Sequence, residues 1–448
     1  MVPSSVTASP DFPDRQRTSP PPTLWDIEHE PTNDARIEQG LAPVDGGSAA
    51  WSLLCAAFVF EALLWGFPLS FGVFQKYYSK VPEFAGNRYV SVVGTIASGV
   101  GYLGAPVVMP FIQRYPRWRR QMIWIGWSIC IAGLALGSFS TTLEVLILTQ
   151  GVAYGIGFLI FYYPILSMVN EYWIARRGMA YGVLCGASGV SGSVMPFILQ
   201  VLLARHGYKT TLRAVAVALA LLTGPFLPFL KGRLPPSERT STPKFNWSFF
   251  QSPLFWIYSI SNLLQGFGYF FPSLYLPSFA SSLGLSGKIG ALLPAMMSVS
   301  QVGGQFTFGV LSDHKVPLNV LACSSTLVAA VACLTLWGLA ESLPVLVVFA
   351  LVYGFFGAGF TAIWVRMSTA ITDDVIAGPI VFTLLNFGKG IGNVLAGPIG
   401  GTLVSVSNPA ATSYHWVIVF TAASMFASAS VILLLFAKYL AICLSRRT

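Results

Sequence analysis

Long apolar runs recur along this chain and constrain its fold more than any other feature. A helix needs about 20 apolar residues to cross a lipid bilayer. Twelve runs approach or exceed this length, with approximate spans 50–74, 89–113, 121–140, 143–168, 178–203, 211–230, 253–280, 288–312, 316–340, 343–370, 377–405 and 414–440. Only 10% of the 448 residues are charged, whereas a soluble domain carries about 25%. We therefore predict an all-α integral membrane protein with twelve transmembrane helices.

The runs fall into two groups of six, separated by a polar stretch. Gly178 and Gly192 correspond to Gly378 and Gly392 at an offset of 200 residues. A repeated offset of this kind indicates an internal repeat, which is common in secondary transporters. We expect two pseudo-symmetric six-helix bundles, at residues 49–230 and 253–440, joined by a cytoplasmic central loop at 231–252. We expect a disordered acidic, proline-rich cytoplasmic tail at residues 1–48 and a cytoplasmic C-terminal tail at 441–448.

Lysine and arginine predict the orientation in the membrane. If both termini are cytoplasmic, the cytoplasmic loops and C-terminus hold 14 of these residues and the outer loops hold seven. Cytoplasmic loops are normally enriched in positive charge, so we expect this orientation. The plasma membrane is the expected location, and the vacuolar membrane is the alternative. The basic residues form no stripe, so we expect no nucleic-acid partner.

Two charged residues lie well inside predicted spans. Glu61 lies in the run 50–74 and Lys389 in the run 377–405. A charge near the bilayer centre is costly, so it usually faces a cavity or a partner. Lys389 is therefore a candidate to attract an anionic substrate, and Glu61 is a candidate proton carrier. The alternative is a structural Glu61–Lys389 ion pair. Arg366, nearer a span end, either contacts substrate or extends to the headgroups.

Glycines recur in the run 178–203 at helical spacing, at Gly178, Gly182, Gly186, Gly189 and Gly192. Small residues at this spacing let helix backbones approach closely. We interpret the stripe as a packing surface.

Signatures of enzymes and of ATP-driven pumps are missing from the sequence. There is no Walker loop, GxSxG elbow or HExxH pair. The four histidines are scattered, and the six cysteines lack metal-ligand spacing. We therefore expect no catalytic residue, no metal and no cofactor.

The loop after the run 288–312 contains a glycine four residues before an aspartate, followed by basic residues: Gly309-Val310-Leu311-Ser312-Asp313-His314-Lys315. Together with six plus six helices, this resembles the major facilitator superfamily. After the run 89–113 the motif is degenerate, because Gln113 stands in place of the aspartate and is followed by Arg114.

A closer resemblance is to the monocarboxylate transporter family, especially its fungal branch. It rests on Asp45-Gly46-Gly47 with Trp51, Trp65-Gly66, Ser70-Phe71-Gly72-Val73-Phe74-Gln75, Tyr154-Gly155-Ile156-Gly157, Pro164, Tyr172-Trp173, Arg176-Arg177-Gly178 and Gly397-Pro398. The resemblance implies transport by alternating access, in which one bundle rocks against the other. It also implies cytoplasmic gating contacts by Arg114, Arg176, Arg177 and Asp313, although positive-inside topology explains the arginines almost as well.

This sequence departs from the family at the residues used for proton-coupled lactate binding. Phe67-Pro68 is followed by Leu69, where lactate carriers have a lysine. Gln301 and Gln305 match the positions of an aspartate and an arginine in those carriers. The resemblance therefore argues against simple lactate uptake.

We predict a transporter of a small, anionic organic molecule, with export of a fungal secondary metabolite as the expected role and protons as a candidate coupling ion. The predicted substrate-binding residues are Glu61, Trp65, Tyr162, Gln301, Gln305, Arg366, Asn386 and Lys389. Uptake of a monocarboxylate or vitamin-like nutrient is the alternative. A non-transporting membrane sensor is an alternative of another class, and a membrane enzyme is the third.

Overall fold

The computed structural model describes residues 41–84, 90–234, 246–314, 316–374, 376–405 and 414–445. The predicted disordered tail lies outside these residues up to position 40. The described residues form helices, turns and loops and contain no β-strand. Residues Ala42–Thr448 make one compact unit.

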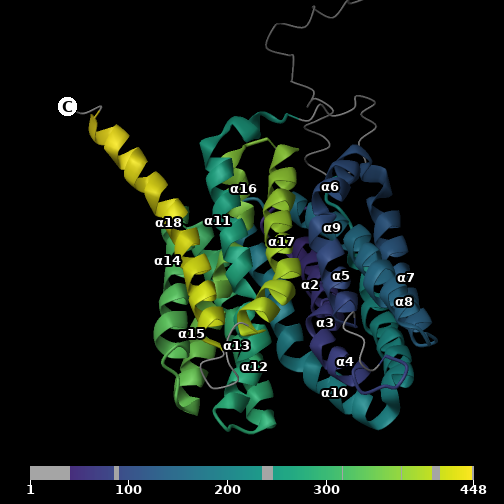
Figure 1. Ribbon diagram of the computed structural model, residues 1–448. Coiled ribbons are helices and arrows are strands. Elements are labelled where there is room, and N and C mark those ends of the chain that lie inside the picture. Colours follow the sequence, from purple (N-terminus) through teal and green to yellow (C-terminus); the bar gives the residue numbers. More distant parts are fainter. Residues whose placement is uncertain are drawn as a thin grey trace, which may run out of the picture. The chain divides into compact units, whose positions relative to one another are not determined.

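The first half of the chain contains helices that run alongside one another (Figure 1). They are α2 (Gly47–Leu64), α3 (Gly66–Leu69), α4 (Phe71–Tyr78), α5 (Val90–Leu103), α6 (Ala105–Arg114), α7 (Arg119–Gly137), α8 (Leu143–Leu146), α9 (Tyr154–Tyr172) and α10 (Arg177–Thr223), with short elements at Pro116–Trp118, Ile147–Ala153 and Gly224–Phe229.

The second half repeats this arrangement. Its helices are α11 (Pro253–Tyr269), α12 (Phe271–Ser282), α13 (Gly287–Asp313), α14 (Leu318–Ala332), α15 (Leu343–Ala362), α16 (Trp364–Ile371), α17 (Ala377–Ser405) and α18 (His415–Ser445), with short elements at Ser248–Gln251 and Cys333–Trp337. The halves meet where α10 packs on α13 and where α17 packs on α5 and α6.

Eight helices of the described chain are long and apolar enough to cross a membrane, or nine if the bent pair Val92–Leu103 and Ala105–Arg114 is one span. One apolar helical stretch, Arg177–Phe229, covers two predicted spans, which separate where Gly207 leaves helical geometry at φ 72°. The predicted span 253–280 corresponds to α11 with α12, and the predicted span 288–312 corresponds to α13. These helices carry buried polar side chains such as Asn262, Gln265 and Gln305. Within the described residues, each of the twelve predicted spans thus lies mostly in helix.

The internal repeat is visible in corresponding hydrogen bonds. The Tyr154 hydroxyl on α9 donates to the Leu64 carbonyl at 2.5 Å, where α2 gives way to α3. The Tyr353 hydroxyl on α15 donates to the Tyr269 carbonyl at 3.2 Å, where α11 gives way to α12. In each half, therefore, a tyrosine satisfies a carbonyl freed at a helix break, which is a condition for irregular backbone inside a membrane.

Close packing of α10 against α13 explains the glycine stripe. A Cβ atom on Gly178 would lie 2.1 Å from the Ser312 hydroxyl and 2.5 Å from the Gly309 carbonyl oxygen. A Cβ on Gly182 would lie 2.6 Å from the Gln305 carbonyl oxygen. Such distances leave no room for a side chain. The interpretation of this stripe as a packing surface is confirmed.

Candidate functional site

A cavity of about 1690 Å³ lies among the helices of both halves. Its lining begins deep in the protein at Glu61 and Lys389 and continues to Gln75, Ser278 and Thr402, near the ends of α4, α12 and α17. These ends lie opposite Asp313, because α12 precedes the start of α13 and Asp313 ends that helix. The cavity therefore extends from the middle of the protein away from the Asp313 end.

Seven of the eight predicted substrate-binding residues line this cavity: Glu61, Trp65, Tyr162, Gln301, Gln305, Asn386 and Lys389. They come from α2, α9, α13 and α17 and from the break between α2 and α3. Residues far apart in sequence thus share one cavity.

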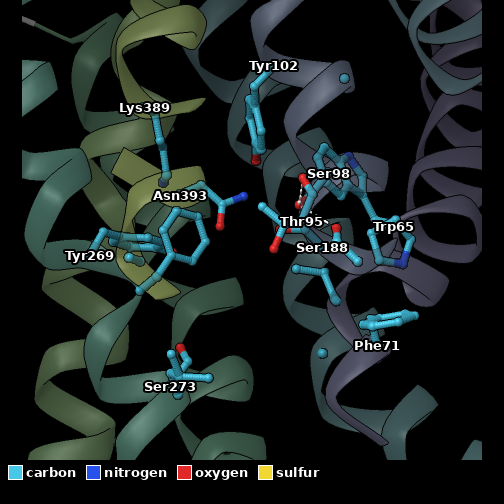
Figure 2. Close-up of a pocket in the computed structure, with 18 of the residues that line it drawn as sticks. Trp65, Phe71, Thr95, Ser98, Tyr102, Ser188, Tyr269, Ser273, Lys389 and Asn393 are labelled. Atoms are coloured by element: carbon cyan, nitrogen blue, oxygen red, sulfur yellow. Dashed lines mark hydrogen bonds between the residues drawn. The ribbon is translucent and has the colours of Figure 1, made fainter. Parts of the chain in front are cut away.

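Lys389 is held by aromatic rings. Its Nζ lies 3.5 Å from the centroid of the Tyr269 ring, 5.3 Å from Trp364 and 5.5 Å from Phe270. The side chain lines the cavity although only 3% of its surface is exposed. Figure 2 shows Lys389 directed toward Tyr269 and Asn393. The negative faces of aromatic rings attract a cation at this range.

Glu61 lies in the same cavity but in different surroundings. Its Oε1 accepts a hydrogen bond from the Tyr162 hydroxyl at 3.2 Å. Its Oε2 is buried and lacks a hydrogen-bond partner. No hydrogen bond or ion pair joins Glu61 to Lys389, both of which are described. The structural ion pair considered from the sequence is therefore absent from this conformation.

The two glutamines join neighbouring helices. Gln301 donates from Nε2 to the Ser188 hydroxyl at 3.2 Å, linking α13 to α10. Gln305 donates from Nε2 to the Thr361 hydroxyl at 3.0 Å, linking α13 to α15, and its Oε1 is buried without a partner. Both side chains therefore position helices at the cavity wall.

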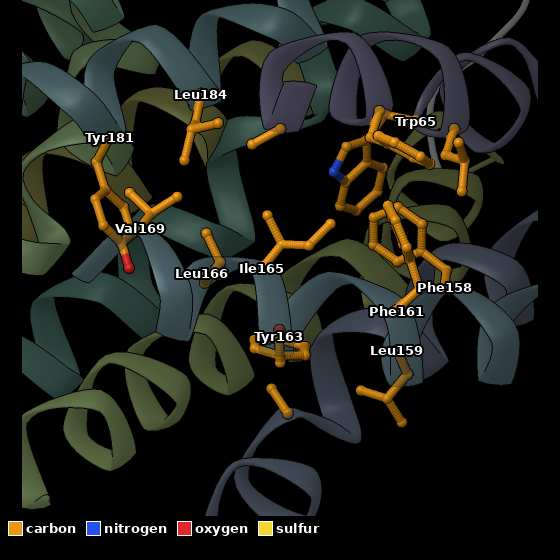
Figure 3. Packing of buried hydrophobic residues seen from close by; sticks show 14 of the residues in the cluster. Trp65, Phe158, Leu159, Phe161, Tyr163, Ile165, Leu166, Val169, Tyr181 and Leu184 are labelled. Atoms are coloured by element: carbon orange, nitrogen blue, oxygen red, sulfur yellow. The ribbon is translucent and has the colours of Figure 1, made fainter. Parts of the chain in front are cut away.

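Aromatic rings form the wall on the side of the first half. Trp65 lies 4.7 Å from Phe158 and 5.2 Å from Tyr102 between ring centroids. Phe158 stacks on Tyr162 at 5.1 Å. Figure 3 shows Trp65 beside Phe158 and Phe161, all members of one buried cluster.

Arg366 lies elsewhere, beside Asp313. It does not line the cavity. Its Nε donates to the Ser312 carbonyl at 3.2 Å and lies 3.7 Å from Asp313 Oδ1. The geometry therefore groups Arg366 with Asp313 rather than with the seven cavity residues.

Asp313 joins the two halves. Its carboxylate accepts hydrogen bonds from the backbone N–H of Gly178 at 2.8 Å and of Met179 at 2.7 Å, in the first turn of α10. The first turn of a helix has unpaired N–H groups and a positive partial charge. An aspartate from the second half thus caps a helix of the first half.

The three predicted gating arginines do not contact Asp313. Arg114 is exposed and lies over the Tyr115 ring. Arg177 donates to the carbonyls of Trp173 and Asn170 at the end of α9. The N–H of Arg176, the N-cap residue of α10, donates to Asp45 Oδ1 at 2.8 Å. In this conformation the arginines therefore act within the first half.

Asp45 falls within the predicted tail 1–48, and the sequence does not reveal its structural role. Its carboxylate also accepts from the N–H of Ile174 at 2.9 Å and of Ala175 at 3.0 Å. Partial burial raises the pKa of Asp45. The three backbone donors and the charge of Arg176 lower it by a larger amount, so the pKa lies below its ordinary value of 3.8. This residue joins the start of α2 to the start of α10.

The rings around Lys389 are also not evident from the sequence. Tyr269, Phe270 and Trp364 are contributed by α11, by the residue between α11 and α12, and by α16. Asn393 was detectable, since it follows Lys389 by four residues and Asn386 precedes it by three, which places all three on one helix face. Nothing in the sequence pairs Trp364 with Lys389.

Comparison with known proteins agrees with this architecture. The family model of the Major Facilitator Superfamily matches residues 53–336. An "MFS transporter asaE" of Aspergillus flavus is 26% identical, over 82% of this chain and 83% of its own length. The "Fujikurins efflux protein" of Gibberella fujikuroi is 25% identical, over 86% and 85%. The "Monocarboxylate transporter 2" of Meriones unguiculatus is 27% identical, over 81% and 79%.

The matched region covers more than half of the chain, and the helices enclose a cavity between two halves related by a repeat. The chain is thus a multi-pass membrane transporter of small organic molecules, and it belongs to the Major Facilitator Superfamily.

Proposed function

We propose that this protein exports a small organic anion, and that the anion is a fungal secondary metabolite. The observation that carries the proposal is Lys389, a buried cation that lines the cavity and is held by rings instead of a carboxylate. A buried charge without a counter-ion is costly, so an anion that reaches it is favoured. A relative named as an efflux protein supports the direction of transport.

Transport by alternating access fits the asymmetry of the cavity. Its lining extends away from the Asp313 end, where α10 and α13 are in close contact. Opening the Asp313 end requires Asp313 to leave Gly178 and Met179. With both termini cytoplasmic, as lysine and arginine predict, the Asp313 end faces the cytoplasm. The plasma membrane is the proposed location.

Glu61 is the proposed proton site. Its carboxyl group is buried, with one oxygen bonded to Tyr162 and the other without a partner. A protonated carboxyl fits such surroundings without a cation nearby. Glu61→Gln, which mimics the protonated form, is expected to retain anion binding and lose the response of transport to a pH gradient. A response equal to that of the unchanged protein would remove Glu61 from this role.

Reconstituted transport tests the proposal. Proteoliposomes that contain the full chain are loaded with a panel of organic anions and their neutral amides, and release is measured. We expect Lys389-dependent release of at least one anion, with a loss of more than tenfold in Lys389→Met and a smaller loss in Lys389→Arg. Trp256→Leu is the control, since Trp256 is exposed on α11 away from the cavity lining. Anion release that is unaffected in Lys389→Met would refute the proposal.

Direction is tested in cells. A deletion strain of the source organism is compared with its parent by metabolite profiling of cells and medium. Export predicts that an anion accumulates in the deleted cells and is depleted from the medium. The opposite distribution would show uptake, the activity suggested by the relative named as a monocarboxylate transporter.

A further inference from the structure

Three hydrogen-bonding side chains form a row along α17. Asn386, Lys389 and Asn393 all line the cavity. They are spaced by three and four residues, so they share one helix face. Seven residues of helix extend about 10 Å. Among the described residues, neither asparagine amide has a hydrogen-bond partner in the protein. The row thus offers a cation with an amide on each side, over about 10 Å.

Aromatic faces surround this row from two directions. Tyr269, Phe270 and Trp364 lie around the ammonium of Lys389. Tyr102, which also lines the cavity, stands next to α17, because a Cβ on Gly390 would lie 2.5 Å from the Tyr102 Cβ. Tyr102 continues through Trp65 and Phe158 as the wall of the first half. A ligand at Lys389 is therefore bordered by rings of both halves.

Ring walls and a large volume select against small carboxylates. The cavity of about 1690 Å³ exceeds the usual 300–1,000 Å³ of small-molecule sites. A small, strongly hydrated carboxylate would have to lose water at Lys389 without gaining contact with the rings. A planar anion whose charge is spread over a conjugated system loses less hydration and gains stacking, at about 0.5–1.5 kcal/mol per ring pair beyond burial.

From these contacts we infer that the cavity binds an elongated, planar organic anion of conjugated or aromatic character. The anionic group of the ligand lies at Lys389, and further hydrogen-bond acceptors lie toward Asn386 and Asn393. The plane of the ligand lies between the rings of Tyr269 and Trp364 on one side and the wall of Tyr102 and Trp65 on the other. The inference rests on the proposed function and specifies its substrate class. Tyr269 and Trp364 then determine specificity for planarity, and Lys389 determines specificity for charge.

Three probes of related shape separate planarity from charge. They are 2-naphthoate, its neutral amide 2-naphthamide, and the saturated anion decahydronaphthalene-2-carboxylate. Binding to the purified full chain is measured by calorimetry. We expect 2-naphthoate to bind at least tenfold more tightly than either of the other two, and more tightly than lactate.

Variants assign each preference to its residues. Tyr269→Leu and Trp364→Leu are expected to lose the preference for the planar over the saturated anion while retaining the preference for 2-naphthoate over its amide. Lys389→Met is expected to lose the preference for 2-naphthoate over its amide while retaining the preference for the planar over the saturated probe. Trp256→Leu, in the same helix as Tyr269 but exposed, is expected to match the unchanged protein.

The outcomes distinguish this inference from the proposed function. Equal affinity for the planar and saturated anions, with both dependent on Lys389, would overturn the inference and leave anion export standing. Equal affinity for 2-naphthoate and its amide, together with no Lys389-dependent anion release from proteoliposomes, would overturn both. If the leucine variants prove unstable, Tyr269→Phe and Trp364→Phe should preserve the planar preference, and its loss in these variants would also count against the inference.

Discussion

The ends of α6 and α13 occupy corresponding places in the two halves, but they differ in one carboxylate. Asp313 at the end of α13 caps the first turn of α10 across the two halves. At the end of α6 stands Gln113, whose Oε1 is buried and has no hydrogen-bond partner. A Cβ on Gly178 would collide with Ser312 and Gly309, whereas a Cβ on Gly378 would meet nothing within 4 Å. A repeat in sequence thus leads to a tight contact on one side of the Asp313 end and a loose one on the other.

The largest expected effect comes from filling the tight contact. Gly178→Val places carbon atoms where Ser312 and the Gly309 carbonyl lie, and overpacking costs about 1–3 kcal/mol. The conformation closed at this end should become about 5- to 150-fold less populated. The distance between spin labels at Arg120 and Val320, measured by electron paramagnetic resonance, should lengthen.

Gly378→Val is the matched control in the other half and should leave that distance unchanged. Equal lengthening in both variants would show that the two contacts do not differ.

A smaller effect is expected from removing the charge of the cap. Asp313→Asn keeps an acceptor for α10 but loses the attraction to the helix terminus and to Arg366. A cap and dipole interaction of this kind contributes about 1 kcal/mol. The closed conformation should be about fivefold less populated by the same spin-label measurement. Gln113→Asn should have no effect, and an effect as large as that of Asp313→Asn would contradict the asymmetry.

The corresponding tyrosines offer a test in which the halves should behave alike. Tyr154→Phe and Tyr353→Phe each remove one donor from a helix break. Hydrogen bonds inside membrane proteins contribute about 0.6 kcal/mol on average. Both variants should therefore lower the thermal unfolding midpoint in detergent by similar, small amounts. A change confined to one half would show that only one break depends on its tyrosine.

The smallest effect is expected at Asp45, which is partly exposed. Its pKa is lower in the folded protein than in the unfolded chain because the N–H donors of Ile174, Ala175 and Arg176 favour the charged form. Its contribution to stability is therefore present above pH 4 and lost as the pH falls through the folded pKa. Asp45→Asn should cost about 0.5 kcal/mol at pH 7, after allowance for solvent screening. The cost, measured by denaturant unfolding, should shrink at pH 3; a cost that grows at pH 3 would contradict this assignment.

Much of the site could be predicted from the sequence because charge inside an apolar span is rare. Glu61 and Lys389 stand out on that ground, and both line the cavity. Gln301 and Gln305 are candidates because of the resemblance to transporters. The prediction that Arg366 binds substrate in this cavity is not supported, since Arg366 lies beside Asp313. The position of a residue along a helix does not reveal which way its side chain faces.

The helical membrane architecture, the repeat and the two buried charges can be predicted from local segments, since they depend on the length, spacing and polarity of those segments. The surroundings of Lys389, by contrast, depend on how the helices pack. Tyr269 ends α11, Phe270 lies between α11 and α12, and Trp364 begins α16. These rings meet the ammonium on α17 only when the helices pack together. The same holds for Asp45 and Asp313, which converge on the start of α10 from opposite directions along the chain. The sequence of one segment can show that a buried charge needs a partner, but the packing of the helices determines which residues contact that charge.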